Sequence, residues 1–134
     1  MKPIKSRITK AFPVGAIIPV VDNSGARQIQ VISVKGYKTR TCMLQAAGIA
    51  DLISGAVKAG KPDMRHKVVQ AVIVRQKQEF TRPDGTKVRF EDNGAVILKD
   101  VRLGLPKGST VKGPIAKEVA LRWKQVAKIA SQVL

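Results

Sequence analysis

Residues 71–98 read AVIVRQKQEFTRPDGTKVRFEDNGAVIL, and their pattern is the clearest indication of how this chain folds. The apolar run at 71–74 predicts one strand, and the alternation of charged and apolar residues at 87–90 predicts a returning strand. Between them, the Pro-Asp-Gly sequence at 83–85 favours a tight turn, because proline presets φ, aspartate tolerates the next position and glycine closes the reversal. The stretch therefore predicts a β-hairpin.

Side chains alternate between the two faces of a strand, so the period of two assigns the charged residues of this hairpin to one side. Val88 and Phe90 are expected on the other side. A hairpin with outward cations suits phosphate better than small-molecule chemistry. The cations expected on this face are Arg75, Lys77, Lys87 and Arg89.

The preceding segments also have the pattern of strands. Gly15 to Val21 is an apolar run whose Pro19 favours an edge position. Arg27 to Lys35 is apolar in part on both faces, which predicts a small closed barrel with an added layer rather than an open sheet. Further strands are predicted at 42–45, 53–58 and 95–98.

The C-terminal part changes to a helical period. Residues 100–113 are irregular, and a helix is expected from Pro114, with an apolar stripe and with lysines opposite it. Leu121 falls among those lysines, so it is either an exposed leucine without a role or a contact for a partner. The stripe is Ile115, Val119, Trp123, Val126, Ala130 and Val133, and the lysines are Lys117, Lys124 and Lys128.

The composition indicates one domain with a polyanionic partner. The 134 residues contain 25 Lys and Arg against nine Asp and Glu, which gives a formal charge of +16. No apolar stretch reaches about 20 residues, and the N-terminal segment lacks the apolar core of a secretory signal, so we expect a cytosolic protein without a membrane partner. We expect a barrel over about 1–99 and a loop and helical portion over about 100–134.

The residues needed for an enzyme are missing. The single histidine has no plausible nucleophile partner in a motif, and neither a phosphate loop nor a dinucleotide fingerprint occurs. One cysteine, Cys42, allows no intramolecular disulfide and is expected in the core. We therefore expect no catalysis, no metal, no cofactor and no small-molecule substrate.

Only five aromatic residues are present, so a platform for stacking single-stranded bases is not predicted. Tyr37 is the one candidate for stacking, whereas Phe90 and Trp123 are expected in the core. The expected mode is recognition of phosphate and shape by Arg and Lys, with little reading of base edges.

Four segments resemble, in order, the universal L-fourteen family of large-subunit ribosomal proteins. They are DNSGAR at 22–27, AVIVRQK at 71–77, RPDGTKVRFEDN at 82–93 and GPIAKE at 113–118. The stretch before Ile17, the VKAGKPDM segment and the Trp123 helix resemble the archaeal and eukaryotic branch. The resemblance implies a mainly β fold: a small five-stranded β-barrel with a projecting β-hairpin and a short α-helical C-terminal portion. The family's C-terminal helices are short, which implies a break near Trp123.

The resemblance also implies a structural role in the large ribosomal subunit, bound to large-subunit rRNA on the subunit-joining face. Implied neighbours are ribosomal protein L-three, small-subunit rRNA at an intersubunit bridge, and the anti-association translation factor six. Five family motif positions are cationic and are expected to contact rRNA: Arg27, Arg75, Lys77, Arg82 and Arg89.

Charge and position add Lys35, Lys38, Arg40, Lys61, Arg65 and Lys87 to the expected rRNA contacts, and Lys117, Leu121, Lys124 and Lys128 form the expected protein or intersubunit contact. The alternative function is a free-standing basic barrel that binds nucleic acid, such as an RNA chaperone or a translation factor.

Overall fold

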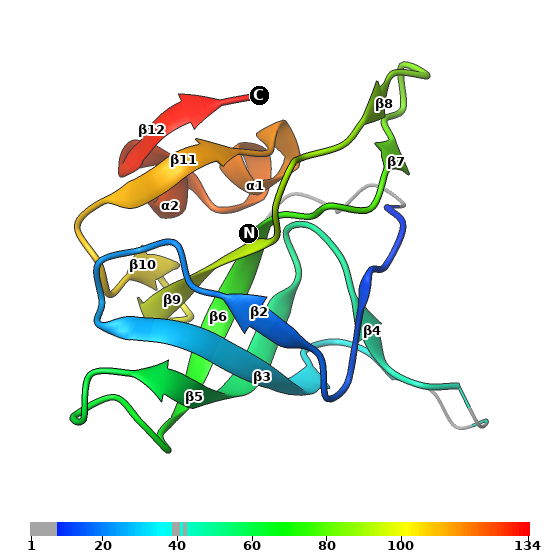
Figure 1. The fold of residues 1–134 in the computed structure, drawn as a ribbon. Helices are drawn as coiled ribbons and strands as arrows, with labels where there is room; N and C mark the ends of the chain where they lie inside the picture. The colour runs from blue at the N-terminus through cyan, green and yellow to red at the C-terminus, as the bar shows by residue number, and fades with distance from the viewer. Residues whose placement is uncertain (1–7, 39–40, 42) are drawn as a thin grey trace.

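The computed structural model describes residues 8–38, 41 and 43–134. The main sheet has six strands in the order β10-β9-β6-β5-β3-β2, and each neighbouring pair is antiparallel (Figure 1). Its strands are β2 (Ile17–Pro19), β3 (Ala26–Val34), β5 (Leu52–Gly60), β6 (Val68–Arg75), β9 (Gly94–Asp100) and β10 (Leu105–Pro106).

The sheet curls so that the chain at the end of β2 meets β9, the strand next to the opposite end of the sheet. Val20, directly after β2, forms a parallel bridge with Ala95 of β9, and the backbone N–H of Val21 donates to the Ala95 carbonyl at 3.0 Å. Strands β2, β3, β5, β6 and β9 thus form the predicted five-stranded barrel. Pro19 lies in the last strand of the sheet order, as its missing N–H predicts.

Apolar side chains of the barrel form two clusters, and strands β6 and β9 contribute to both. Ala71, Ile73 and Ile97 belong to the cluster inside the barrel, together with residues of β2, β3 and β5. Val72 and Leu98 belong to the second cluster, which includes Trp123 and other residues of the C-terminal portion. Both faces of β6 are covered at residues 71–74, which agrees with the continuous apolar run there. The sequence of residues 27–35 predicted an added layer on the barrel, and the structure has this layer over β6 and β9. It does not cover β3 at Ile32, which is exposed.

The predicted hairpin forms as two separate pairings. Strands β6 and β9 pair within the barrel, and β7 (Phe80–Thr81) pairs with β8 (Lys87–Val88) in a ribbon that projects from it (Figure 1). The tight turn is confirmed, because the Gly85 N–H donates to the Arg82 carbonyl at 2.9 Å. Gly85 has φ of +87°, a conformation that favours glycine.

One local prediction before β5 is wrong and another is not tested. The strand predicted at 42–45 is instead β4 (Ala46–Ala47), which pairs with β1 (Phe12–Pro13). Cys42, predicted in the core, lies outside the described residues.

The continuous helix predicted from Pro114 is wrong. Pro114 lies in strand β11 (Val111–Ile115), which is followed by helices α1 (Lys117–Arg122) and α2 (Lys124–Lys128). The chain ends in β12 (Ala130–Val133), which pairs in parallel with β11. The break at Trp123 is confirmed: its backbone is non-helical, while its buried indole N–H donates to the Ala50 carbonyl at 3.0 Å. No helix of the described residues is long and apolar enough to span a bilayer.

Candidate nucleic-acid interface

The ribbon presents cations to solvent. Lys87 lies on β8, and Lys77 and Arg89 lie on the segments that lead into and out of the ribbon; all three are exposed. The only ion pair among them in the described part of the chain joins Lys87 to Glu79 at 3.5 Å, and both side chains are more than half exposed. Water screens such a pair, so these three cations stay available to a polyanion.

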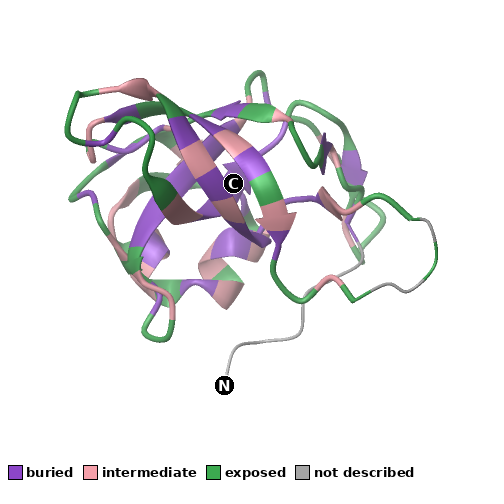
Figure 2. Cartoon of the chain, turned by 90° about the horizontal axis from the view of Figure 1, so that it is seen from below, coloured by how far each residue is buried: buried purple, intermediate pink, exposed green. Residues whose placement is uncertain are grey.

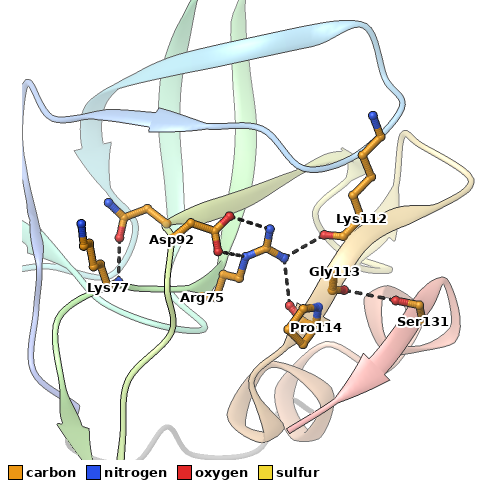
Figure 3. A network of polar contacts seen from close by, with 8 residues as sticks. Arg75, Lys77, Asp92, Lys112, Gly113, Pro114 and Ser131 are labelled. Atoms are coloured by element: carbon orange, nitrogen blue, oxygen red, sulfur yellow. Dashed lines mark hydrogen bonds and ion pairs between the residues drawn. The ribbon is translucent and has the colours of Figure 1, made fainter.

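Arg75 does not share this face, contrary to the prediction. The residue is 6% exposed, and its guanidinium forms two hydrogen bonds with the Asp92 carboxylate, at 2.7 and 2.9 Å (Figure 3). It also donates to the carbonyls of Lys112 at 2.8 Å and Pro114 at 3.0 Å. The β6–β9 pairing is irregular between Ile73 and Arg75, so the alternation of the strand is interrupted there. Arg75 therefore joins β6, the segment before β9, and β11.

Arg82 is also engaged within the chain. Its Nε donates to Glu118 Oε1 at 2.8 Å, and its Nη2 donates to the main-chain oxygen of Leu134 at 2.6 Å. The two side chains of this ion pair are 17% and 11% exposed. Arg82 therefore links the turn of the ribbon to helix α1 and to the end of the chain.

The remaining predicted rRNA contacts lie on the barrel. Arg27 is exposed on β3, and four more exposed residues lie in loops: Lys35, Lys38, Lys61 and Arg65. Figure 2 shows exposed residues mainly on connecting segments, and strands on which buried residues alternate with more exposed ones. Arg40 lies outside the described residues.

A hollow of about 480 Å³ lies beside the turn between β2 and β3. Its lining includes two of the predicted cations, Arg27 and Lys61, and adds Lys112, which sequence reasoning missed. Lys112 lies in β11, far along the chain from the other two cations. The surrounding segment is rich in glycine and proline, and its sequence does not indicate that Lys112 lies beside the β2–β3 turn.

The aromatic residues are placed as predicted, and the stacking candidate is covered. Phe80, Phe90 and Trp123 are buried. Tyr37 is half-buried, and Lys10 Nζ lies 4.3 Å from the centre of its ring. This cation–π contact occupies one face of the Tyr37 ring.

The C-terminal helices form a second exposed surface. Lys117 and Leu121 lie on α1, and Lys124 and Lys128 lie on α2; all four are exposed, with Leu121 at 57%. The stripe residues Val119, Trp123 and Val126 are buried beneath them.

One titrating group in the ribbon has a shifted pKa. The backbone N–H of Thr86 donates to Asp84 Oδ1 at 2.9 Å, and with the Thr86 side chain it lowers the pKa of Asp84 below its ordinary value of 3.8. Arg82 adds a smaller effect in the same direction. Hydrogen bonds to the charged form cause this shift, so the Asp84 carboxylate stays ionised to a lower pH than a free one. No group of three or more His, Cys, Asp or Glu side chains that could hold a metal occurs among the described residues.

Comparison with known proteins supports the predicted family and branch. The family model "Ribosomal protein L14p/L23e" matches residues 11–134. The chain is 55% identical over 130 residues to "Large ribosomal subunit protein uL14" of Nanoarchaeum equitans, covering 97% of both chains. It is 46% identical over 134 residues to the protein of the same description from Picrophilus torridus, covering both chains completely. Both relatives are archaeal. The chain therefore belongs to the ribosomal protein L14p/L23e family.

Proposed function

We propose that the chain is a structural constituent of the large ribosomal subunit in the cytoplasm and that it binds large-subunit rRNA without catalysis. The observation that carries this proposal is the set of exposed cations on the ribbon and loops, which lack strong acidic partners in the described structure. Family membership and a net charge of +16 support it.

The contacts we propose are to phosphate and shape. Buried aromatic rings cannot stack on bases, whereas flexible lysines and arginines on a rigid barrel can follow a folded backbone. Arg75 and Arg82 are removed from the direct contacts, because their guanidinium groups are engaged internally. The proposed direct contacts are Arg27, Lys35, Lys38, Arg40, Lys61, Arg65, Lys77, Lys87 and Arg89.

For the C-terminal surface we propose a place on the subunit-joining face. Its exposed Leu121 between Lys117 and Lys124 combines apolar and cationic contacts on two short helices anchored by Trp123. The proposed partners are ribosomal protein L-three, small-subunit rRNA at an intersubunit bridge, and the anti-association translation factor six. This assignment rests on the family resemblance and on the exposure of the four residues Lys117, Leu121, Lys124 and Lys128.

The test is the salt dependence of binding between the purified chain and large-subunit rRNA. If about 6 to 8 phosphates are neutralised, log affinity should fall against log salt with a slope of about −4 to −7. A flat response would contradict recognition of phosphate. The alternative, a free-standing RNA-binding barrel, predicts the same slope but a soluble pool of the chain outside the ribosome.

A further inference from the structure

The hollow between β2, β5 and β11 lies away from the projecting ribbon. Figure 1 shows the β2–β3 turn at one side of the barrel and the β7–β8 ribbon at the other. Residues from three separate parts of the chain line it: the Asp22–Arg27 segment, the end of β5, and Lys112 of β11. The geometry of this hollow supports a more specific role than general attraction of a polyanion.

The floor of the hollow is built from backbone that only glycine permits. A Cβ on Gly60 would lie 2.6 Å from the Gly25 carbonyl oxygen and 2.8 Å from the Ala26 Cα. Gly25 has φ of +98°, and its side-chain position is occupied by the stem of Lys61, whose Cδ would lie 3.1 Å from a Cβ there. The β2–β3 turn and the end of β5 therefore lie in close contact at Gly25 and Gly60. Both glycines line the hollow, where they add no side chain that would fill it.

The three cations reach this surface from positions that the fold fixes. The Lys61 N–H donates to the Gly25 carbonyl at 2.9 Å, so both the backbone and the stem of Lys61 are held against the turn. The Lys112 N–H donates to the Val21 carbonyl at 2.7 Å, and its carbonyl accepts from Arg75. Figure 3 shows the Lys112 side chain extending away from Arg75. The third cation is Arg27, near the start of β3.

The acidic residue in the lining forms no ion pair with these cations in the described structure. Asp22 is 7% exposed, and its carboxylate accepts from the backbone N–H groups of Ser24 at 3.1 Å and Ile97 at 2.9 Å, and from the Ser24 hydroxyl. The lining therefore carries three cations, Arg27, Lys61 and Lys112, against one carboxylate that is bonded to other groups. This excess of positive charge favours an anion.

We infer that this hollow is a single phosphodiester site, in which Arg27, Lys61 and Lys112 converge on one backbone phosphate of folded RNA. The inference rests on the proposed rRNA-binding function and deepens it. A volume of about 480 Å³ falls within the range of pockets for small ligands, so it accommodates the phosphate together with a flanking sugar. No aromatic ring lines it, and the Asn23 amide is bonded to Ser109, so the site recognises charge and not the base.

Salt dependence distinguishes one shared phosphate from three separate ones. The test variant combines Arg27→Gln, Lys61→Met and Lys112→Met, where methionine keeps the apolar stem that covers Gly25. Its affinity for large-subunit rRNA should fall roughly 10- to 100-fold, while the salt slope should become less negative by only about 0.7 to 0.9. A change in slope of about 2 to 3 would mean that each cation neutralises its own phosphate, and would overturn the inference.

The matched control removes the same charge elsewhere, by Lys58→Met, Lys67→Met and Lys99→Met, which change three exposed lysines outside the proposed contacts. Urea unfolding of both variants confirms that each is folded under the binding conditions. An affinity loss in the control as large as in the test variant would show that net charge alone explains the effect, and would overturn the inference.

A measurement without rRNA separates this site from the proposed function. Titration of the purified chain with the dinucleotide UpU, which carries one phosphodiester, should shift the NMR amide signals of Gly25, Gly60 and Lys61. Uridine should not shift them, and the test variant should not respond. The site would stand even if the wild-type chain showed no salt-dependent rRNA binding, in which case the proposed function alone would fail. Shifts with inorganic phosphate but not with UpU would overturn the assignment to RNA.

Discussion

Replacing Arg75 with methionine should destabilise the fold without removing an RNA contact. Arg75 makes four hydrogen bonds of 2.7–3.0 Å from a side chain that is 7% exposed. The two bonds to main-chain carbonyls are expected to contribute about 1 kcal/mol each. Asp92 is 56% exposed and can be hydrated after the change, so the ion pair adds only about 1 kcal/mol. The expected loss in the free energy of unfolding is about 3 kcal/mol.

Urea unfolding at constant m-value measures this loss, and thermal unfolding should show a fall in Tm of about 10 °C for a chain of this size. The matched control is Lys77→Met, which removes the same charge two residues away from an exposed position. Its effect on stability should stay within about 0.5 kcal/mol. At a temperature where both variants are folded, Lys77→Met should weaken rRNA binding more than Arg75→Met.

The opposite pattern would refute this reasoning. If Arg75→Met were as stable as Lys77→Met and still lost rRNA affinity by tenfold or more, the guanidinium would be a direct RNA contact. The internal bonds to Asp92 and β11 would then contribute little to the fold.

Three other predictions concern backbone geometry, pH and charge. Gly60→Ala should lower the free energy of unfolding by about 2 to 3 kcal/mol in urea, because its Cβ would lie 2.6 Å from a carbonyl oxygen of the facing turn; unchanged stability would contradict that close approach. Asp84 has a lowered pKa, so its stabilising contribution is fully present above pH 3.8 and is lost as pH falls through the lower pKa of the folded state. An NMR titration of the Thr86 amide should show a midpoint below pH 3.8. A midpoint above pH 3.8 would refute the hydrogen bond from the Thr86 N–H to the Asp84 carboxylate. The double change Lys87→Gln and Arg89→Gln should weaken rRNA binding and make the salt slope less negative by about 1.4 to 1.8, with an unchanged slope removing the ribbon from the interface.

Local patterns predicted the barrel well. Pro83 to Gly85 form the predicted turn, and Pro19 lies in the edge strand, because the φ restrictions of proline and glycine act within a few residues. The apolar run at 71–74 predicted a buried strand, and burial on both faces explains why it does not alternate.

Contacts between distant segments could not be predicted in the same way. Arg75 continued an alternating pattern, but a pairing irregularity and the carbonyls of β11 place it inside the molecule. Of the predicted helical stripe, only Val119 and Val126 lie in helices, with Trp123 at the break between them. Ile115 belongs to β11, and Ala130 and Val133 belong to β12, because these two segments pair in parallel. Lys112 enters the cationic hollow only through the folding of β11 against the β2–β3 turn.

The central claim, that this chain is an integral part of the large ribosomal subunit, is tested most directly by sedimentation of native cell extract. Fractions of a sucrose gradient at moderate and then at high salt would be probed for the chain. An integral subunit protein should stay with the large subunit through the high-salt wash. Its appearance only at the top of the gradient would show that it is not integral and would favour a free-standing RNA-binding barrel.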